Sequence, residues 1–214
     1  ADAVQRLRTL KHREAKPFAL MAANVDAVRE WCLVGEAEAA LLASPAAPIV
    51  LLQRRDPPPP LPVPAIADSV APGLNTLGFM LPSTGVHLLV LRRMQRPIVL
   101  TSGNLSEEPQ AITLDALKER FGSAVDYVLD HGRPIARRVD DSVARVMDGA
   151  PRLLRRARGH APAPIALPPG FERAPAVLAY GGELKNTFGL LREGQAVLSQ
   201  HLGDLEDAAA QADY

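Results

Sequence analysis

The residues best suited to bind a ligand follow a short apolar run at residues 98–100. The run ends in Thr101, Ser102, Gly103 and Asn104, which offer hydroxyls, an amide and a sterically unrestricted backbone. In open α/β sheets, ligands bind beyond the carboxyl ends of strands, and free backbone N–H groups there can face anionic oxygens. The pattern therefore predicts an anion-binding turn, although the same residue types also make ordinary turns.

A basic segment near the start of the chain carries charge of the opposite sign. Lys11, Arg13 and Lys16 precede an apolar strand expected over residues 18–22. If residues 11–13 are extended, Lys11 and Arg13 face the same side and can hold one polyphosphate together. For Lys16 a role at the surface is the alternative.

A second basic segment lies between residues 131 and 160, where eight arginines stand against three aspartates. The formal net charge of the whole chain is zero, so this excess is local. A guanidinium can bind phosphate or carboxylate through two hydrogen bonds, so clustered arginine suits a discrete anionic ligand. A salt-bridged surface is the alternative. The balanced charge disfavours nonspecific binding to nucleic acids or membranes.

Composition excludes several classes of site. The single cysteine, Cys32, rules out an internal disulfide and a cysteine cage for zinc, and we expect it to be buried and structural. The sequence contains neither GxxxxGK[ST] nor GxGxxG, so P-loop and dinucleotide sites are unsupported. The five histidines are scattered, so no metal site is predicted from them. Without a signal peptide or a long apolar stretch, we expect a cytoplasmic protein.

Alternating helix and strand patterns predict an α/β fold with a mixed sheet. Helices are expected over residues 1–10, from a cap at Asn24 or Asp26 to residue 31, and over 36–42, 87–92 and 113–121. Strands are expected over residues 18–22, 48–52, 77–81, 98–101, 127–129, 143–147, 153–155, 176–180, 187–191 and 195–199. Residues 57–60 are four prolines and predict a stiff exposed connection. Residues 192–194 predict a hairpin turn.

Six stretches, in order, carry a resemblance to a known family: KHREAKPFALM, APGLNTLGFMLP, PIVLTSGNLSEEP, RPIARRVDDSVAR, LLRRARGHAP and LKNTFGLL with LSQHLGDLE. Together they resemble the carbamoyltransferases of the HypF type, over about residues 10–206. The resemblance implies a YrdC-like twisted mixed sheet with flanking helices at residues 1–160 and a proline-rich linker at 161–175. Residues 176–214 are then the opening hairpin of an actin-like ATPase (ASKHA) transfer domain. Since most of that domain, and the family's acylphosphatase and zinc-binding domains, have no counterpart here, we expect a fragment or a truncated product.

The resemblance also implies an activity, with ATP and Mg²⁺ as cofactors. Carbamate, derived from carbamoyl phosphate, attacks the α-phosphate of ATP, and carbamoyl adenylate forms as pyrophosphate leaves. The carbamoyl group then passes to a HypE-like acceptor protein and ends as a cyanide ligand of [NiFe]-hydrogenase. Neither a membrane nor a nucleic acid is an expected partner, and the few aromatic residues disfavour an RNA-binding module.

The resemblance assigns roles to individual residues. The catalytic contacts fall on Lys11, Arg13, Ser102 and Asn104, and no protein ligand to a metal is assigned. The family places further ligand contacts near Arg137, Ser142 and Arg155. Lys16 and Thr101 are additional candidates from their own residue types and positions. Arg138, Arg156 and Arg158 are alternatives in a shifted register. Asp140 and Asp141 either hold these arginines or bind Mg²⁺.

Two related activities remain as alternatives. A threonylcarbamoyl-AMP synthase for tRNA modification would use nearly the same nucleotide site, with threonine as an added substrate. An O-carbamoyltransferase that acts on a small molecule would share the two-domain arrangement. The strings LKNTFGLL and RRARGHAP favour the HypF type over the first of these.

Overall fold

The computed structural model describes residues 1–57, 65–105, 108–205 and 211. These residues divide into two compact units. Unit 1 consists of residues 1–101 and 141–155, and unit 2 of residues 102–140 and 156–214.

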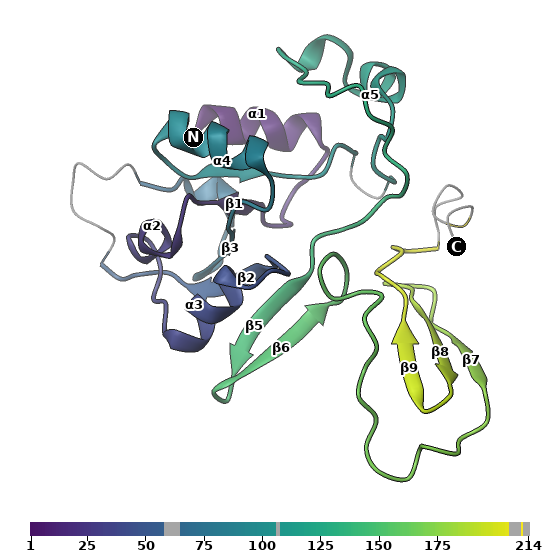
Figure 1. The fold of residues 1–214 in the computed structure, drawn as a ribbon. Helices are drawn as coiled ribbons and strands as arrows, with labels where there is room; N and C mark the ends of the chain where they lie inside the picture. The colour runs from purple at the N-terminus through teal and green to yellow at the C-terminus, as the bar shows by residue number, and fades with distance from the viewer. Residues whose placement is uncertain (58–64, 106–107, 206–210, 212–214) are drawn as a thin grey trace. The chain divides into compact units, whose positions relative to one another are not determined.

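Unit 1 is built on a six-stranded mixed sheet with the strand order β4-β1-β3-β2-β5-β6 (Figure 1). The strands are β1 (Ala19–Met21), β2 (Ile49–Gln53), β3 (Thr76–Met80), β4 (Ile98–Leu100), β5 (Val143–Met147) and β6 (Ala150–Arg155). The pairs β1–β3 and β2–β5 are parallel, and the pairs β1–β4, β2–β3 and β5–β6 are antiparallel. The expected mixed α/β sheet is therefore confirmed.

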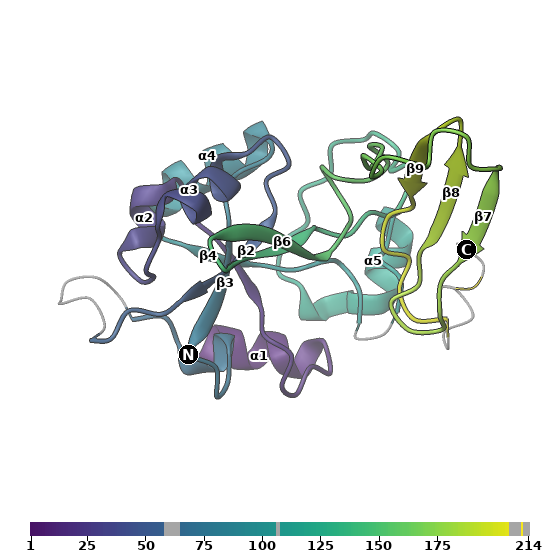
Figure 2. The same ribbon diagram turned by 90° about the horizontal axis from the view of Figure 1, so that it is seen from below.

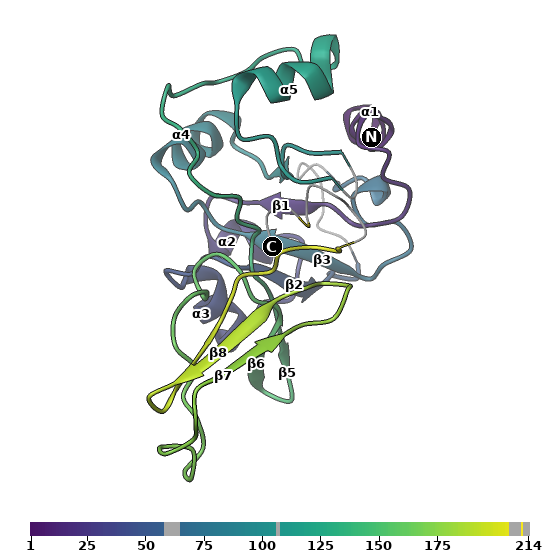
Figure 3. The same ribbon diagram turned by 90° about the vertical axis from the view of Figure 1, so that its right-hand side faces the viewer.

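Helices cover both faces of this sheet. They are α1 (Asp2–Leu10), α2 (Val25–Arg29), α3 (Glu36–Ala43), the 3₁₀ helix η1 (Asp68–Val70) and α4 (Gly85–Met94). Figures 2 and 3 show α1 on one face and α2, α3 and α4 on the other. The expected cap is present, because the Asn24 side chain accepts a hydrogen bond from the backbone N–H of Ala27 at 2.8 Å.

Successive residues of a strand point to opposite faces of the sheet, so the apolar residues of unit 1 pack into a core on each face. Phe79 in β3 is fully buried and stacks against Trp31, with ring centroids 6.4 Å apart. Its neighbour Met80 belongs to a second cluster with Met21 of β1 and Leu91 of α4. These packed side chains fix the strands from which the candidate site residues project.

Unit 2 contains α5 (Leu114–Phe121), the 3₁₀ helix η2 (Gly122–Ala124) and a three-stranded antiparallel sheet of β7 (Val177–Tyr180), β8 (Phe188–Arg192) and β9 (Gln195–Leu198). Glu193 and Gly194 join β8 to β9 with φ angles of 53° and 73°. Two successive positive φ angles are typical of the expected hairpin turn. Within the stretch expected to be a linker, Ile165 forms a bridge to Ala196 of β9.

Two expectations about strands were wrong. Residues 127–129 form no strand, and Tyr127 is 93% exposed, because this apolar triplet has no neighbouring strand to cover it. The last strand of unit 1 starts at Ala150 rather than residue 153, because Asp148 and Gly149 close a hairpin with β5.

Three expectations remain, which concern Cys32, the proline run and the domain boundaries. Cys32 is buried as expected, and burial raises the pKa of its thiol to about 12 despite the nearby charge of Arg54. Most of the proline run at 57–60 lies outside the described residues. The boundaries 1–160, 161–175 and 176–214 stay a prediction.

We expect Phe79→Ala to lower the free energy of unfolding by about 3–5 kcal/mol, since it leaves a cavity beside Trp31. Urea denaturation of the chain measures this effect. Leu89→Ala is the control on α4, because Leu89 is 65% exposed, and it should change stability by less than about 0.5 kcal/mol. Equal losses for the two variants would contradict the described core.

Candidate functional site

The loop after α1 carries the first group of predicted site residues. The backbone N–H of Lys11 donates to Leu7 O at 3.0 Å, and that of Arg13 donates to Arg8 O at 3.0 Å. His12 between them has a φ of 50°. Residues 11–13 are therefore a tight turn at the end of the helix and not an extended segment, so the expectation built on an extended backbone was wrong.

Arg8 holds this loop in place, and the sequence analysis did not single it out. Its side chain is buried, and its guanidinium donates to main-chain carbonyls on both sides. Nε donates to Ser69 O at 2.6 Å, and Nη1 donates to the carbonyls of Arg13 and Glu14 at 3.0 Å each. The only sequence signal is an arginine at a helical position whose neighbours Val4 and Leu7 pack on the core.

Arg13 is held in the same loop by its own contacts. Its Nε donates to Lys16 O at 2.9 Å, and Nη2 donates to Pro17 O. The guanidinium carbon lies 4.5 Å from the centroid of the Phe18 ring, and that of Arg8 lies 5.0 Å from the same centroid. A cation above an aromatic face is favourable, so Phe18 helps to hold both charges.

Several predicted residues of unit 1 lower one another's pKa through their positive charges. The pKa of Lys11 is lowered to about 8, first by burial and then by the charges of Arg13 and Lys16. The pKa of Arg13 is lowered by burial and then by Arg8 and Arg155. Residues from the start of the chain and from the end of β6 therefore lie in one field of positive charge. Such a cluster favours an anionic ligand, which relieves the repulsion.

Three further predicted residues belong to unit 1. Arg155 donates through Nε to Asp141 O at 2.8 Å, which orients it at the end of β6. Ser142 is fully buried, and its carbonyl accepts from Ile49 N at 2.8 Å. Thr101 directly follows β4 and is half-buried.

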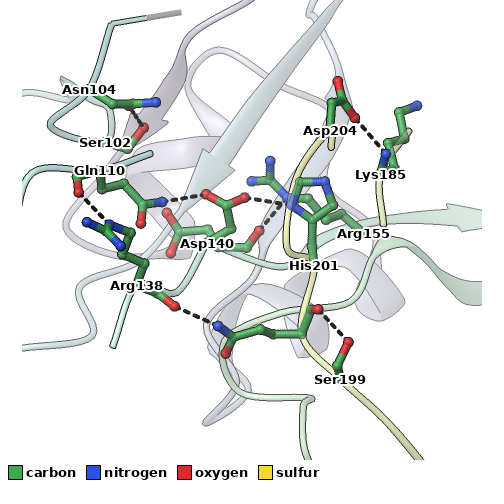
Figure 4. Close-up of polar contacts among 12 residues, drawn as sticks. Ser102, Asn104, Gln110, Arg138, Asp140, Arg155, Lys185, Ser199, His201 and Asp204 are labelled. Atoms are coloured by element: carbon green, nitrogen blue, oxygen red, sulfur yellow. Dashed lines mark hydrogen bonds and ion pairs between the residues drawn. The ribbon is translucent and has the colours of Figure 1, made fainter. Parts of the chain in front are cut away.

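The turn at residues 102–104 lies in unit 2 and has a defined shape (Figure 4). Ser102 Oγ donates to Asn104 Oδ1 at 2.5 Å, so these two predicted side chains converge. Asn104 Nδ2 donates to Glu108 O at 2.6 Å, and Ala111 N donates to Gly103 O at 2.8 Å. These two hydrogen bonds thus tie the turn to Glu108 and to Ala111.

The arginines of unit 2 have different environments. Arg137 is exposed. Among the alternatives, Arg138 Nε donates to Gln110 O at 2.8 Å, and Arg156 Nη2 donates to the carbonyls of His160 and Ala163 at 2.7 Å each. These contacts hold backbone, which suits Arg138 and Arg156 to a structural role. The residue-level site assignment stays a prediction.

Sequence reasoning also missed a polar network around Asp140, shown in Figure 4. Gln110 Nε2 donates to Asp140 Oδ1 at 2.8 Å, and His201 Nδ1 lies 2.8 Å from Asp140 Oδ2. The available signal was a histidine in the string QHLGD and an aspartate in VDDSV. Nothing in the sequence alone indicates that two residues 61 positions apart are partners.

No three His, Cys, Asp or Glu side chains within the described ranges converge as a metal site. None of the helices in the described part of the chain has both the length and the apolar character needed to cross a membrane.

Comparison with known proteins identifies the family. The profile of the Sua5/YciO/YrdC family, described as telomere recombination, matches residues 1–157. The chain belongs to this family. The profile of the HypF Kae1-like domain matches residues 172–214, so the chain joins a Sua5/YciO/YrdC segment to the start of a HypF-type segment.

Individual relatives agree with this assignment. The carbamoyltransferase HypF of Rhodobacter capsulatus is 47% identical over 221 residues, which cover 100% of this chain and 28% of the relative. A full-length HypF in a phosphate- and nucleotide-bound form superposes with a TM-score of 0.90 at 40% identity, covering 100% of this chain and 27% of that one. The chain thus spans about a quarter of the length of these HypF relatives.

A more distant structure shares the fold. Sua5 of P. abyssi, complexed with L-threonine, matches 73% of this chain and 44% of its own with a TM-score of 0.61 and 22% identity. At this identity the likeness concerns the YrdC-like fold. The expected fold class is confirmed by these neighbours together with the two profile matches.

We expect Arg8→Met to lower the free energy of unfolding by about 2–4 kcal/mol, because it leaves several main-chain carbonyls without a donor. Thermal or urea unfolding measures the loss. Arg6→Met is the matched control on the same helix, since Arg6 is exposed, and it should cost less than about 0.5 kcal/mol. A loss for Arg8→Met no larger than that for Arg6→Met would show that the hydrogen bonds of Arg8 do not hold the loop.

Lys11 should also make stability depend on pH. Its pKa is about 8 in the folded chain and 10.5 in the unfolded one, so the unfolded chain binds more protons between these values. Stability should therefore rise with pH from about 8 to 10.5, by about 3 kcal/mol, relative to Lys11→Met. Unfolding titrations of both proteins at several pH values provide the difference, and parallel curves would show that Lys11 is not buried as described.

Proposed function

We propose that the chain binds ATP through the cationic loop of unit 1 and forms carbamoyl adenylate from ATP and carbamate. The observation that carries this proposal is the shared positive field of Lys11, Arg13, Lys16 and Arg155. Lys11 is only 3% exposed and has cations as neighbours. A bound polyphosphate would offset the repulsion between these charges and favour the charged form of Lys11.

The proposed chemistry follows from where charge develops. A carbamate oxygen forms a bond to the α-phosphorus, the bond to the β-phosphate oxygen breaks, and pyrophosphate leaves with the electron pair. Negative charge grows on the phosphates in the transition state. Fixed cations such as Arg13 and Lys11 stabilise that charge without rearranging, and positioning supplies the remainder of the rate.

The other predicted residues keep the roles that the family resemblance gives them. Ser102, Asn104 and Thr101 are proposed to contact phosphate or carbamoyl oxygens, and Arg137 and Ser142 to make further ligand contacts. Mg²⁺ would add charge neutralisation when bound, and it usually reaches such sites through phosphate oxygens with one or two protein ligands.

Relatives support the nucleotide and the acceptor. A full-length HypF structure is in a phosphate- and nucleotide-bound form. The match of residues 172–214 to the HypF Kae1-like domain supports carbamoyl transfer as the purpose of the adenylate. We therefore propose carbamoyl phosphate as the source of carbamate and a HypE-like protein as the final acceptor.

A second candidate is the formation of threonylcarbamoyl adenylate, in which threonine is an additional substrate. Its support is the fold shared with Sua5 complexed with L-threonine. The HypF Kae1-like match beyond residue 172 favours the first candidate. Transfer to a small molecule would use the same adenylate and differ only in the acceptor.

We expect the purified chain to release pyrophosphate from ATP and Mg²⁺ when carbamate is supplied from ammonium and bicarbonate, with no dependence on threonine. Arg13→Ala should weaken ATP binding about 10–100-fold in calorimetry, because a guanidinium contact to phosphate is lost. Arg173→Ala, an exposed arginine of unit 2, is the control and should bind ATP like the parent.

The possible results separate the candidates. Pyrophosphate release that requires threonine supports the second candidate over the first. Unchanged ATP affinity in Arg13→Ala would show that the nucleotide does not bind at this loop.

A further inference from the structure

A polar network in unit 2 joins the two segments that match different family profiles. Asp140 accepts from Gln110 through one carboxylate oxygen and contacts His201 through the other, at 2.8 Å in each case (Figure 4). Gln110 and Asp140 lie within the Sua5/YciO/YrdC match, and His201 lies within the HypF Kae1-like match. The contact is therefore a direct link between the two.

Backbone hydrogen bonds hold both ends of this link. His201 N donates to Arg156 O at 2.9 Å, and Arg158 N donates to Asp140 O at 3.0 Å. Next to His201, Gln200 Nε2 donates to Arg138 O at 2.6 Å. The His201 and Asp140 side chains are only 16% and 25% exposed, so water competes weakly for this contact.

From Gln110 the link continues to the Ser102–Asn104 turn. Ala111, the next residue, donates its backbone N–H to Gly103 O at 2.8 Å. Arg138 Nε also donates to Gln110 O at 2.8 Å, so both the side chain and the carbonyl of Gln110 are fixed. The position of Gln110 thus sets where the Ala111 amide meets Gly103 O and closes the turn.

We infer that His201 is a positioning residue for the Ser102–Asn104 turn, acting through Asp140 and Gln110. An ionised carboxylate only accepts hydrogen bonds, so His201 Nδ1 is the donor and the ring supplies a directed contact. The inference deepens the proposed function, because the turn is the part of unit 2 that is proposed to contact the nucleotide.

Coupling of this kind is reciprocal. If the contact of His201 improves ATP binding at the turn, ATP binding must stabilise the attachment of residues 199–205 by the same factor. Occupancy of the adenylating site then orders the start of the segment that resembles the transfer domain. Adenylate formation and readiness of the transfer segment are then linked through the contacts of Gln200 and His201 with Arg138, Asp140 and Arg156.

Two variants of His201 test the inference. Asn places an amide nitrogen at the position of Nδ1, whereas Gln places its amide one bond farther out. We expect His201→Asn to keep the ATP affinity of the parent within about twofold and His201→Gln to weaken it about five- to tenfold. Gln195→Ala, on the exposed side of β9, is the control and should leave the affinity unchanged.

A double variant separates positioning from general damage. Gln110→Ala should weaken ATP binding about as much as His201→Gln, and the two together should lose no more than either one alone, since they interrupt the same link. Losses that multiply would show independent effects and overturn the inference. If His201→Gln does not fold, Gln110→Ala and His201→Asn still provide the comparison.

Hydrogen exchange tests the link without any nucleotide. The Ala111 amide should exchange about five- to tenfold faster in His201→Gln and Gln110→Ala than in the parent and His201→Asn. Equal exchange in all four proteins would overturn the inference. If the parent does not bind ATP, the proposed function fails, and the exchange of Ala111 still decides whether His201 positions the turn.

Discussion

Like charges held together in one loop are the constraint on which the candidate site depends. Two unit charges about 6 Å apart repel by about 3 kcal/mol at an effective dielectric constant of about 20. Repulsion of this kind lowers the pKa of Lys11, through Arg13 and Lys16, and the pKa of Arg13, through Arg8 and Arg155, in addition to the effect of burial. A hydrogen bond to a charged group contributes about 1.5–3 kcal/mol, so the several carbonyls that accept from Arg8 can offset this repulsion. In the described residues, neutral carbonyls thus hold the Arg8 guanidinium, and through it the loop, without adding negative charge.

The sheet explains how distant residues share that field. Arg155 ends β6, which pairs with β5, and β5 runs parallel to β2 in the middle of unit 1. The loop that carries Lys11 and Arg13 leads directly into β1 of the same sheet. Both segments therefore belong to one sheet, and the charge of Arg155 is close enough to lower the pKa of Arg13. An all-parallel order would need longer crossover connections between these strands.

Unit 2 uses polar contacts where unit 1 uses apolar packing. Its sheet of β7, β8 and β9 exposes apolar side chains such as Leu178 and Tyr180, and its order depends on specific hydrogen bonds such as that between Asp140 and His201. Networks of this kind specify one geometry but tolerate the loss of a partner poorly. That property suits the positioning role inferred for His201.

The sequence by itself determined the local features of this protein. The cap at Asn24, the turn at Glu193 and Gly194, and most strands followed from residue types within a few positions of each other. The convergence of Ser102 and Asn104 was predictable for the same reason. Only the tertiary structure decided that Arg8 is buried, that the Lys11 pKa falls to about 8, and that His201 contacts Asp140. These properties depend on solvent exclusion and on contacts across 61 positions of sequence, and no local pattern encodes which distant segments exclude water from one another.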